Sequence, residues 1–314
     1  MTVLVWGVPT ESPIALVAEE LTALAADVVI VHPGRAAEYS LTMELNPSRP
    51  AVTGVIRVGT RRVGLAELTG VYLRPIEPDL VPQLGALAPQ SVERCHARSV
   101  HDALVAYTEI AEVAYGTRVV NRLSAMASNM SKPFQAQAVL ARGFHIPETL
   151  VTDDPDEALA FAERFSDIIY KSTSGVRSIV TAFDRSTDVA RLPLLRWCPV
   201  QFQERVFGAD VRVHVVGTDV FAAIVESNAL DYRYARSQVG IDATLRPYRL
   251  SPDIAQRCIA LADDLDLPFA GIDLKLADDG RVVCFEVNPS PGFSWYQLDT
   301  GLPIAEALAR WLLG

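Results

Sequence analysis

The sequence predicts a mixed fold, in which an α/β unit is followed by α+β segments. Two observations support this prediction. Residues 2–7, "TVLVWG", form a β-rich run before a helical pattern at 14–25 and a second apolar run, "DVVIVHP", which is typical of a β-α-β opening. Near the other end, "AGIDLKLA" and "RVVCFEVN" flank Asp278-Asp279-Gly280, a strong signal for a β-hairpin.

The elements between these two ends follow in order. In the first part, "GVYLRP" at 70–75 predicts a strand, 89–115 has the apolar spacing of a long helix, and "TRVVN" at 117–121 predicts a closing strand. From residue 131 the pattern predicts helix 131–143, strand 148–152, helix 155–165 and strand 167–171. The last part predicts strands at 200–206, 210–217 and 220–227, a helix at 251–265, the hairpin and a helix at 302–313. We therefore expect three units, at 1–121, 122–198 and 199–314.

Composition limits the classes of function. With 314 residues and 50% hydrophobic side chains the chain can form a large core, and its net charge of −10 disfavours a broad surface for nucleic acid or anionic membrane. No apolar run approaches the roughly 20 residues of a membrane span, and the N-terminus lacks the features of a signal peptide. The four cysteines are far apart, as expected of reduced thiols. We expect a cytoplasmic protein with no nucleic-acid or membrane partner.

The segment "YKSTSGVRS" is a candidate phosphate-binding loop. It places Lys171 at the end of a predicted strand and continues with small residues that include Ser172, Ser174 and Gly175. Backbone N–H groups of such a loop can approach phosphate oxygens while the lysine supplies a positive charge. Taken alone, the loop is more commonly the turn of a β-hairpin.

The predicted hairpin carries a candidate metal site. Glu286 and Asn288 are two residues apart on one strand, so they can point to the same side as Asp273 on the paired strand. Mg²⁺ prefers oxygen ligands and usually also binds phosphates, so the three residues predict a magnesium–nucleotide site, with Mn²⁺ as an alternative ion. The other interpretation is that Asp273 and Glu286 cap the hairpin or pair with Lys275 and Arg281.

Several other side chains have two interpretations. Trp295 and Tyr296 are candidates to line a substrate pocket, although packing under the last helix is the commoner role of such residues. Arg74, in "YLRP", is a candidate to face the cleft from the first unit. None of the five histidines has the spacing of a metal ligand pair.

The tail "EVNPSPGFSWYQLDTGLPIAEALARWL" resembles the ATP-grasp superfamily. It is most similar to RimK-like ligases and to the peptide-cyclising ligases of graspetide pathways, and the resemblance extends over residues 121–314. It implies an ATP-grasp fold preceded by an N-terminal α/β domain, with ATP and Mg²⁺ as cofactors.

The resemblance also implies roles for individual residues. Lys132 and Lys171 match the two lysines that contact nucleotide phosphates, and Ser172, Ser174 and Gly175 match the loop over them. The segment "QERV" matches the hinge at the adenine, Asp210 matches the acidic residue at the ribose, and Asp273, Glu286 and Asn288 match the magnesium ligands. The hinge residues are Gln203, Glu204, Arg205 and Val206.

Arg212 and Arg233 match basic residues near the γ-phosphate or acyl phosphate, although any single arginine is more often a surface ion-pair partner. Lys132, at a helix start, would without the resemblance be a solvated flank. After "DYR" the sequence continues "YARSQVG", where the ribosomal-protein ligases have Asn and paired glycines. The acceptor substrate is therefore left open.

The function that the resemblance implies is that of an ADP-forming carboxylate–amine ligase. A substrate carboxylate attacks the γ-phosphate of ATP, and an amine then displaces phosphate from the acyl phosphate. The substrate is an amino acid or a peptide, and by analogy we expect a homo-oligomer. Two alternatives are a graspetide-type macrocyclase that forms side-chain esters or amides, and a non-catalytic ATP-binding scaffold or sensor.

Overall fold

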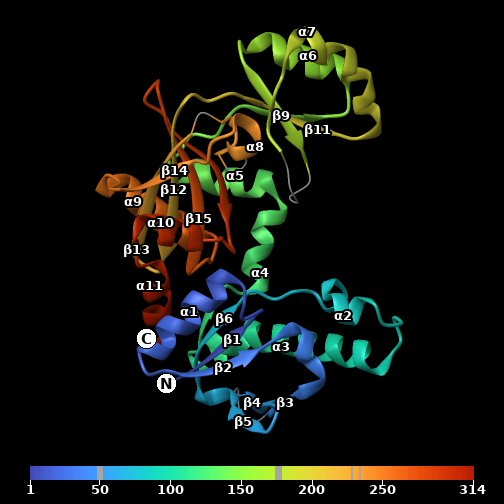
Figure 1. Cartoon of the computed structure of the whole chain (residues 1–314), viewed down its shortest axis with the longest axis vertical. Helices are drawn as coiled ribbons and strands as arrows, with labels where there is room; N and C mark the ends of the chain where they lie inside the picture. The colour runs from blue at the N-terminus through green and yellow to red at the C-terminus, as the bar shows by residue number, and fades with distance from the viewer. Residues whose placement is uncertain (48–51, 174–178, 228, 233–234) are drawn as a thin grey trace.

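The computed structural model describes residues 1–47, 52–173, 179–227, 229–232 and 235–314. Three of the predicted site residues, Ser174, Gly175 and Arg233, lie outside the described residues. The first third of the chain forms one end of the molecule, and the C-terminal sheet lies between that end and a separate sheet that contains β9 and β11 (Figure 1).

The N-terminal unit is built on a parallel sheet with strand order β2-β1-β6-β7. Alternation along β1 divides its side chains between two cores: Val3 and Val5 face α1, whereas Leu4 and Trp6 face α3. The predicted β-α-β opening is confirmed. The strands are β1 (Thr2–Trp6), β2 (Asp27–Val31), β6 (Leu68–Leu73) and β7 (Arg118–Val120), and the helices are α1 (Ser12–Ala23), α2 (Pro82–Gly85) and α3 (Val92–Tyr115).

A small antiparallel sheet of order β3-β4-β5 was not expected from the sequence. It packs on the α3 side of the parallel sheet, where Ile56 and Val63 join the core around Leu104. Its strands are β3 (Tyr39–Leu45), β4 (Val52–Val58) and β5 (Arg61–Gly64), and the short 3-10 turns of this region are η1 (Pro33–Glu38), η2 (Leu65–Glu67) and η3 (Pro78–Leu80).

The middle of the chain forms a sheet of order β10-β9-β11-β8, which we call the lid sheet. Phe161, Leu192 and Phe202 form its own core. Asp154 accepts hydrogen bonds from the backbone N–H groups of Asp156 and Glu157, which explains why a helix begins there. The elements are β8 (Thr149–Thr152), α6 (Pro155–Arg164), β9 (Ile168–Ser172), β10 (Thr181–Ala182), α7 (Arg185–Asp188), η5 (Val189–Trp197) and β11 (Val200–Glu204), preceded by α4 (Leu123–Met126), η4 (Ala127–Met130) and α5 (Lys132–Ala141).

The C-terminal sheet is antiparallel, with order β14-β13-β12-β15-β16. On β12, Val211, Val213 and Val215 enter a core with α9, so the alternate residues Asp210 and Arg212 belong to the opposite face. The strands are β12 (Gly208–Val216), β13 (Asp219–Glu226), β14 (Thr244–Tyr248), β15 (Phe269–Ala277) and β16 (Val282–Asn288). The helices are α8 (Ala235–Val239), α9 (Pro252–Asp264), α10 (Ser294–Thr300) and α11 (Ile304–Leu313).

Helix α11 joins the C-terminal sheet to the N-terminal unit, and it lies beside α1 in Figure 1. Ile14, Leu308 and Phe269 belong to one continuous core. On β6, a Cβ at Gly70 would lie 2.5 Å from the backbone oxygen of Leu312, so the close approach of α11 requires glycine. The two units are therefore packed together as parts of one body.

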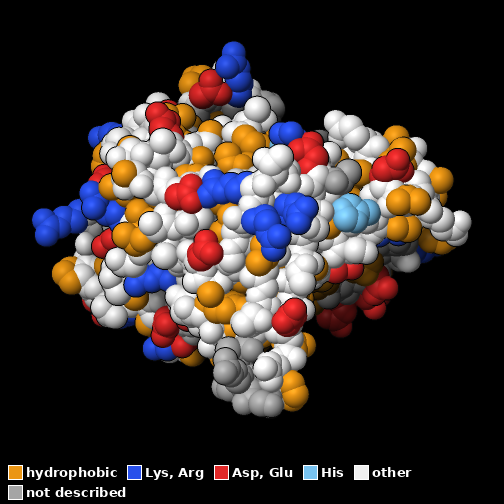
Figure 2. All heavy atoms as spheres, turned by 90° about the horizontal axis from the view of Figure 1, so that it is seen from below, with side chains coloured by type: hydrophobic (Ala, Val, Ile, Leu, Met, Phe, Trp, Pro, Cys, Tyr) orange, Lys and Arg blue, Asp and Glu red, His pale blue; other side chains and the backbone are white. Residues whose placement is uncertain are grey.

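The face seen in Figure 2 carries basic, acidic and hydrophobic side chains that are interspersed, so positive and negative potentials partly cancel over it. Among the helices of the described residues, none combines the length and the apolar character needed to cross a bilayer.

Candidate active site

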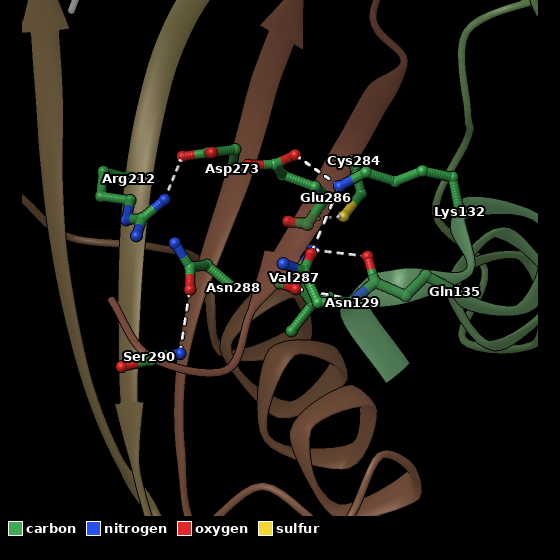
Figure 3. A network of polar contacts seen from close by, with 10 residues as sticks. All are labelled: Asn129, Lys132, Gln135, Arg212, Asp273, Cys284, Glu286, Val287, Asn288 and Ser290. Carbon is green, nitrogen blue, oxygen red and sulfur yellow. Dashed lines mark hydrogen bonds and ion pairs between the residues drawn. The ribbon is translucent and has the colours of Figure 1, made fainter. Parts of the chain in front are cut away.

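Three charged side chains form a row across the open face of the C-terminal sheet. Arg212 on β12 is the register partner of Asp273 on β15, which in turn is the partner of Glu286 on β16. Directly opposed residues share a face, so the predicted common orientation of Asp273 and Glu286 is confirmed by the pairing. Arg212 Nη1 lies 2.6 Å from Asp273 Oδ1, and only 6% of Arg212 is exposed (Figure 3).

Lys132 reaches this row from the start of α5. Its Nζ atom lies 2.7 Å from Glu286 Oε2 and 3.4 Å from Asn129 Oδ1 (Figure 3). The helix begins there because the Ser131 hydroxyl accepts a hydrogen bond from the backbone N–H of Phe134. Lys132 and its partner Glu286 are thus brought together across 154 residues of sequence, and the contact of Lys132 with nucleotide phosphates that the resemblance implied stays a prediction.

Neighbouring rows continue the polar face on either side. On one side Asp210 pairs with Lys275, with 3.2 Å between Nζ and Oδ1, and burial raises the pKa of the Asp210 carboxyl although Lys275 opposes this shift. On the other side lie His214, Gly271 and Asn288. A Cβ at Gly271 would meet the Arg212 guanidinium and the Pro291 ring, so glycine leaves room for both.

The electrostatics around Arg212 favour its charged form. Burial is the largest influence and opposes the charge, but the Asp273 carboxylate together with Tyr296 and Tyr232 outweighs it, so the pKa of the guanidinium is raised. Tyr232 Oη lies 3.4 Å from Asp273 Oδ1 and 3.1 Å from Tyr296 Oη, and burial together with Asp273 holds the pKa of Tyr232 well above its usual value. Tyr296 is buried and is part of this cluster, because its hydroxyl contacts Tyr232 and its ring lies beside the Arg212 guanidinium.

A cavity of about 290 Å³ lies between this face and the lid sheet. Of the predicted site residues, those that line it are Lys171, Gln203, Glu204, Arg205, Val206, Asp210, Asp273 and Glu286. The predicted hinge and the predicted metal strands therefore meet at one cavity. Ser172, at the end of β9, is exposed and does not line it. Lys132, Arg212 and Asn288 do not line it either, although Lys132 and Arg212 pair with the lining residues Glu286 and Asp273.

The alternative pairings are not those observed. Lys275 pairs with Asp210 instead of Asp273, and Arg281 pairs with Glu204 at 2.9 Å and with Asp279 at 2.8 Å instead of Glu286. Within the described residues, Asp273 instead forms an ion pair with Arg212, and Glu286 forms one with Lys132.

Comparison with known proteins identifies the family. Residues 130–312 match the RimK-like ATP-grasp domain. The chain belongs to the RimK-like ATP-grasp family. It is therefore an ADP-forming carbon–nitrogen ligase, and its fold and its use of ATP follow from membership.

Three similar proteins illustrate this membership. The ribosomal protein bS6–L-glutamate ligase of Escherichia coli O7:K1 (strain IAI39 / ExPEC) is 26% identical over 207 residues, which cover 63% of this chain and 68% of that protein. The ATP-grasp ligase PsnB, complexed with a minimal precursor, Mg and ADP, is 26% identical with a TM-score of 0.77, over 99% of this chain and 96% of that chain. The macrocyclase MdnC of Microcystis aeruginosa MRC, bound with the precursor peptide MdnA, is 23% identical with a TM-score of 0.78, over 100% and 99% of the two chains.

The donor set of this ATP-grasp chain fits a magnesium ion. On the paired strands β15 and β16 the register places the carboxylates of Asp273 and Glu286 opposite each other, with the Asn288 amide two residues further along β16, so three oxygen donors lie on one face of the sheet. Mg²⁺ is usually bound by one or two carboxylates together with substrate phosphates and water. Asn288 Oδ1 accepts from the backbone N–H of Ser290 at 2.9 Å (Figure 3), and an amide oxygen has a second lone pair for a metal.

Some residues of the ATP-grasp site were missed by sequence reasoning. Gln135 on α5 is buried, donates to the Val287 carbonyl at 2.7 Å and accepts from the Val287 N–H at 3.3 Å (Figure 3). It thus pairs with β16 as a neighbouring strand would. The available signal was its position three residues after Lys132, on the same side of the helix. Lys275 had a signal too, because it is two residues from Asp273 on one strand.

A second cavity, of about 160 Å³, is lined by residues of the lid sheet and η5 and by none of the row Arg212–Asp273–Glu286. Its lining is mainly apolar and includes Phe183, Leu192 and Leu195, with Asp188 and Arg191 as charged members. None of the predicted site residues lines it.

Proposed function

We propose that this RimK-like ATP-grasp ligase activates a carboxylate of a peptide substrate with ATP and joins it to an amine. The observation that supports the proposal is the row Arg212–Asp273–Glu286 beside a cavity that Lys171 also lines. This arrangement combines carboxylates for a metal and the Arg212 cation on the C-terminal sheet with the Lys171 cation on the lid sheet, so that positive charge is available for phosphate groups.

In this proposal the cavity holds the nucleotide. The hinge Gln203–Val206 meets the adenine and Asp210 the ribose, while Lys171, Ser172 and Lys132 contact phosphates. Asp273, Glu286 and Asn288 hold Mg²⁺, with Mn²⁺ as an alternative. The bound ion would supply charge neutralisation on the phosphates. Ser174, Gly175 and Arg233 keep their proposed roles at the phosphates, although they lie outside the described residues.

The proposed reaction has two steps. A carboxylate oxygen attacks the γ-phosphorus, the bond to the β–γ bridging oxygen breaks, and ADP leaves with that electron pair. The amine nitrogen then attacks the acyl carbon, phosphate departs, and the nitrogen loses a proton. Arg212 and Lys132 lower the barrier by facing the negative charge that builds up on the transferred phosphoryl group.

Two observations favour a peptide over a free amino acid. PsnB, which is similar in structure over 99% of this chain, was solved with a minimal precursor, and the name of the ribosomal protein bS6–L-glutamate ligase gives a polypeptide as one of its two substrates. In addition, the apolar lid cavity offers a contact remote from the reacting groups, which an extended substrate can use and a free amino acid does not need. The second candidate is cyclisation within one peptide, since the macrocyclase MdnC has the same fold over the whole chain.

The test is to incubate the full chain with ATP, Mg²⁺ and pooled peptides and amino acids, following phosphate release together with product mass. A ligase gives ADP and phosphate with a product one water lighter than its two parts, and a cyclase gives one peptide that has lost one water. Hydroxylamine cleaves an ester product and leaves an amide intact. Formation of AMP and pyrophosphate would contradict the acyl-phosphate route, and ATP binding without turnover would favour a scaffold.

The remaining proposals concern the cellular compartment and the oligomeric state of the protein. Cys95, Cys198, Cys258 and Cys284 are free thiols, which agrees with a reducing compartment, and we propose the cytoplasm. We also propose a homo-oligomer, by analogy with related ligases. Size-exclusion chromatography with light scattering tests that proposal, and a monomer at assay concentration would overturn it.

A further inference from the structure

The carboxyl edge of the N-terminal parallel sheet is occupied by a segment of the same chain. In open parallel sheets this edge is where ligands usually bind. Here Arg74 follows β6 and Asn121 follows β7, and both donate hydrogen bonds to residues 289–291, which we call the loop after β16. This loop begins one residue after Asn288, the last of the proposed metal ligands.

Arg74 holds the loop through several bonds at once. Its Nη1 atom lies 2.9 Å from Ser290 Oγ, 3.2 Å from the Ser290 carbonyl oxygen and 3.3 Å from the Pro291 carbonyl oxygen. Its Nε atom donates to Glu11 at 2.6 Å, just before α1, and 16% of its side chain is exposed. A largely buried guanidinium that loses such acceptors is costly, so the loop and the N-terminal sheet are fixed relative to each other.

The loop also contacts Asn288 and the space around Arg212. The backbone N–H of Ser290 donates to Asn288 Oδ1, which orients the amide (Figure 3). The Pro291 ring lies against Gly271, at the place where the Arg212 guanidinium also packs. Any shift of residues 290–291 therefore moves one proposed metal ligand and the space around Arg212.

We propose that Arg74 is a positioning residue of the metal site, acting through Ser290 on Asn288 and through Pro291 on Arg212. This inference rests on the proposed function, because it assumes that Asp273, Glu286 and Asn288 bind Mg²⁺. It makes the N-terminal unit a part of the site without placing any of its side chains on the nucleotide. Groups that orient metal ligands contribute about 10- to 100-fold to metal affinity in other sites.

The experiment measures ADP binding to the full chain by calorimetry, with and without Mg²⁺. We expect Arg74→Gln to weaken the Mg²⁺-dependent part of ADP binding about 10- to 100-fold and to leave metal-free ADP binding unchanged. The matched control is Arg118→Gln. Arg118 lies on β7 of the same sheet and donates to the Trp311 carbonyl of α11 at 2.7 Å, so it also joins the two units, but its bond is to α11 and not to the loop after β16. The control should leave both measurements unchanged.

Two further variants keep the outcomes distinct. Arg74→Lys retains the charge beside Glu11 but cannot reach all the acceptors, so it should fold and show an intermediate loss. Glu286→Gln should abolish the Mg²⁺-dependent increment. The positioning role is wrong if Glu286→Gln loses the Mg²⁺-dependent increment in ADP binding while both Arg74 variants keep it. It is also wrong if the Arg74 variants lose metal-free ADP binding as strongly as they lose Mg²⁺-dependent binding. If Glu286→Gln also keeps the increment, the metal assignment itself is wrong and the inference is overturned with it.

Discussion

The N-terminal parallel sheet and the C-terminal antiparallel sheet both contribute to the site, but with different parts. The C-terminal sheet uses its face, where cross-strand neighbours such as Arg212 and Asp273 stand in rows. The N-terminal sheet uses its carboxyl edge, where Arg74 and Asn121 bond to backbone atoms of the loop after β16. The comparison teaches that the side chains proposed to do chemistry lie on an alternating face, while the side chains proposed to hold them come from a sheet edge far away in sequence.

The largest effects are expected at the two carboxylates on the face. Glu286→Gln and Asp273→Asn should each lower turnover by about 10³-fold or more, since each removes charge that faces the metal and phosphates. Their stabilities should differ. Asp273→Asn leaves the buried Arg212 unpaired, at a cost of about 3–5 kcal/mol, whereas Lys132, the partner of Glu286, is 43% exposed, so Glu286→Gln should cost less than about 1 kcal/mol. Phosphate release and Tm are the two measurements.

Equal losses of stability in the two variants would contradict this contrast. They would mean that breaking the buried Arg212–Asp273 pair costs no more free energy of folding than breaking the exposed Lys132–Glu286 pair. Retained turnover in Glu286→Gln would exclude it from the metal site. Asn121→Asp serves as a control at the edge: it removes an amide donor to the Phe269 and Pro289 carbonyls and should reduce stability more than it reduces ATP binding.

Two glycines, one in each sheet, sharpen the comparison at smaller magnitude. A Cβ at Gly271 would meet the Arg212 guanidinium and lie 2.6 Å from Pro291 Cβ, so Gly271→Ala should misplace Arg212 and lower turnover about 10²-fold. A Cβ at Gly70 would meet the Leu312 backbone, so Gly70→Ala should push α11 from β6 and cost about 1–3 kcal/mol with turnover nearly unchanged. The measurements are kcat and Tm of both variants. The opposite assignment, with Gly70→Ala inactive and Gly271→Ala active, would refute the division of roles.

The sequence was informative where the interaction is local. The hairpin of β15 and β16 follows from alternation and from Asp278-Asp279-Gly280. The register next to the turn would place Asp273 opposite Phe285, and a β-bulge between Asp273 and Leu274 shifts it so that Asp273 faces Glu286, which the sequence pattern did not indicate. Family resemblance added Lys132 and Arg212, whose partners lie 154 and 61 residues away in sequence. No local periodicity indicates which distant strand β12 pairs with, so the row could not have been derived from spacing.

The features that the sequence did not predict are mainly contacts between residues distant in sequence, and short helices and strands. Arg74 was only a candidate to face the cleft, because its acceptors lie 216 and 217 residues away. Helix α10 and strand β14 were not predicted; α10 has only seven residues, and β14 contains Pro247, which disfavours a strand. The division into three units stays a prediction, and the pairing of β11 with β8 and β9 favours placing the second boundary after Glu204.

The smallest predicted effect concerns pH and a buried histidine on the face of the C-terminal sheet. His214 is fully buried beside Arg212, Phe269 and Tyr296, and burial, followed by the Arg212 charge, holds its pKa well below the usual value. In the unfolded chain a histidine titrates near pH 6.5, so below that pH the unfolded state binds a proton that the folded state does not. Stability should therefore fall as the pH drops from about 6.5 toward the folded pKa, by up to about 1.4 kcal/mol per pH unit.

The variant His214→Leu should remove this slope, because the replacement is apolar, of similar size and cannot titrate. At pH 7.5 its stability should be close to that of the wild type, since His214 is neutral there and neither ring nitrogen has a partner within the described residues. The control is His101→Gln on α3, where the imidazole packs against Trp6 on the parallel sheet with Glu77 3.7 Å away. It should keep the slope, because His214 remains. Unfolding free energies between pH 5 and pH 8 decide the matter, and a slope that survives in His214→Leu would assign the pH dependence to another group.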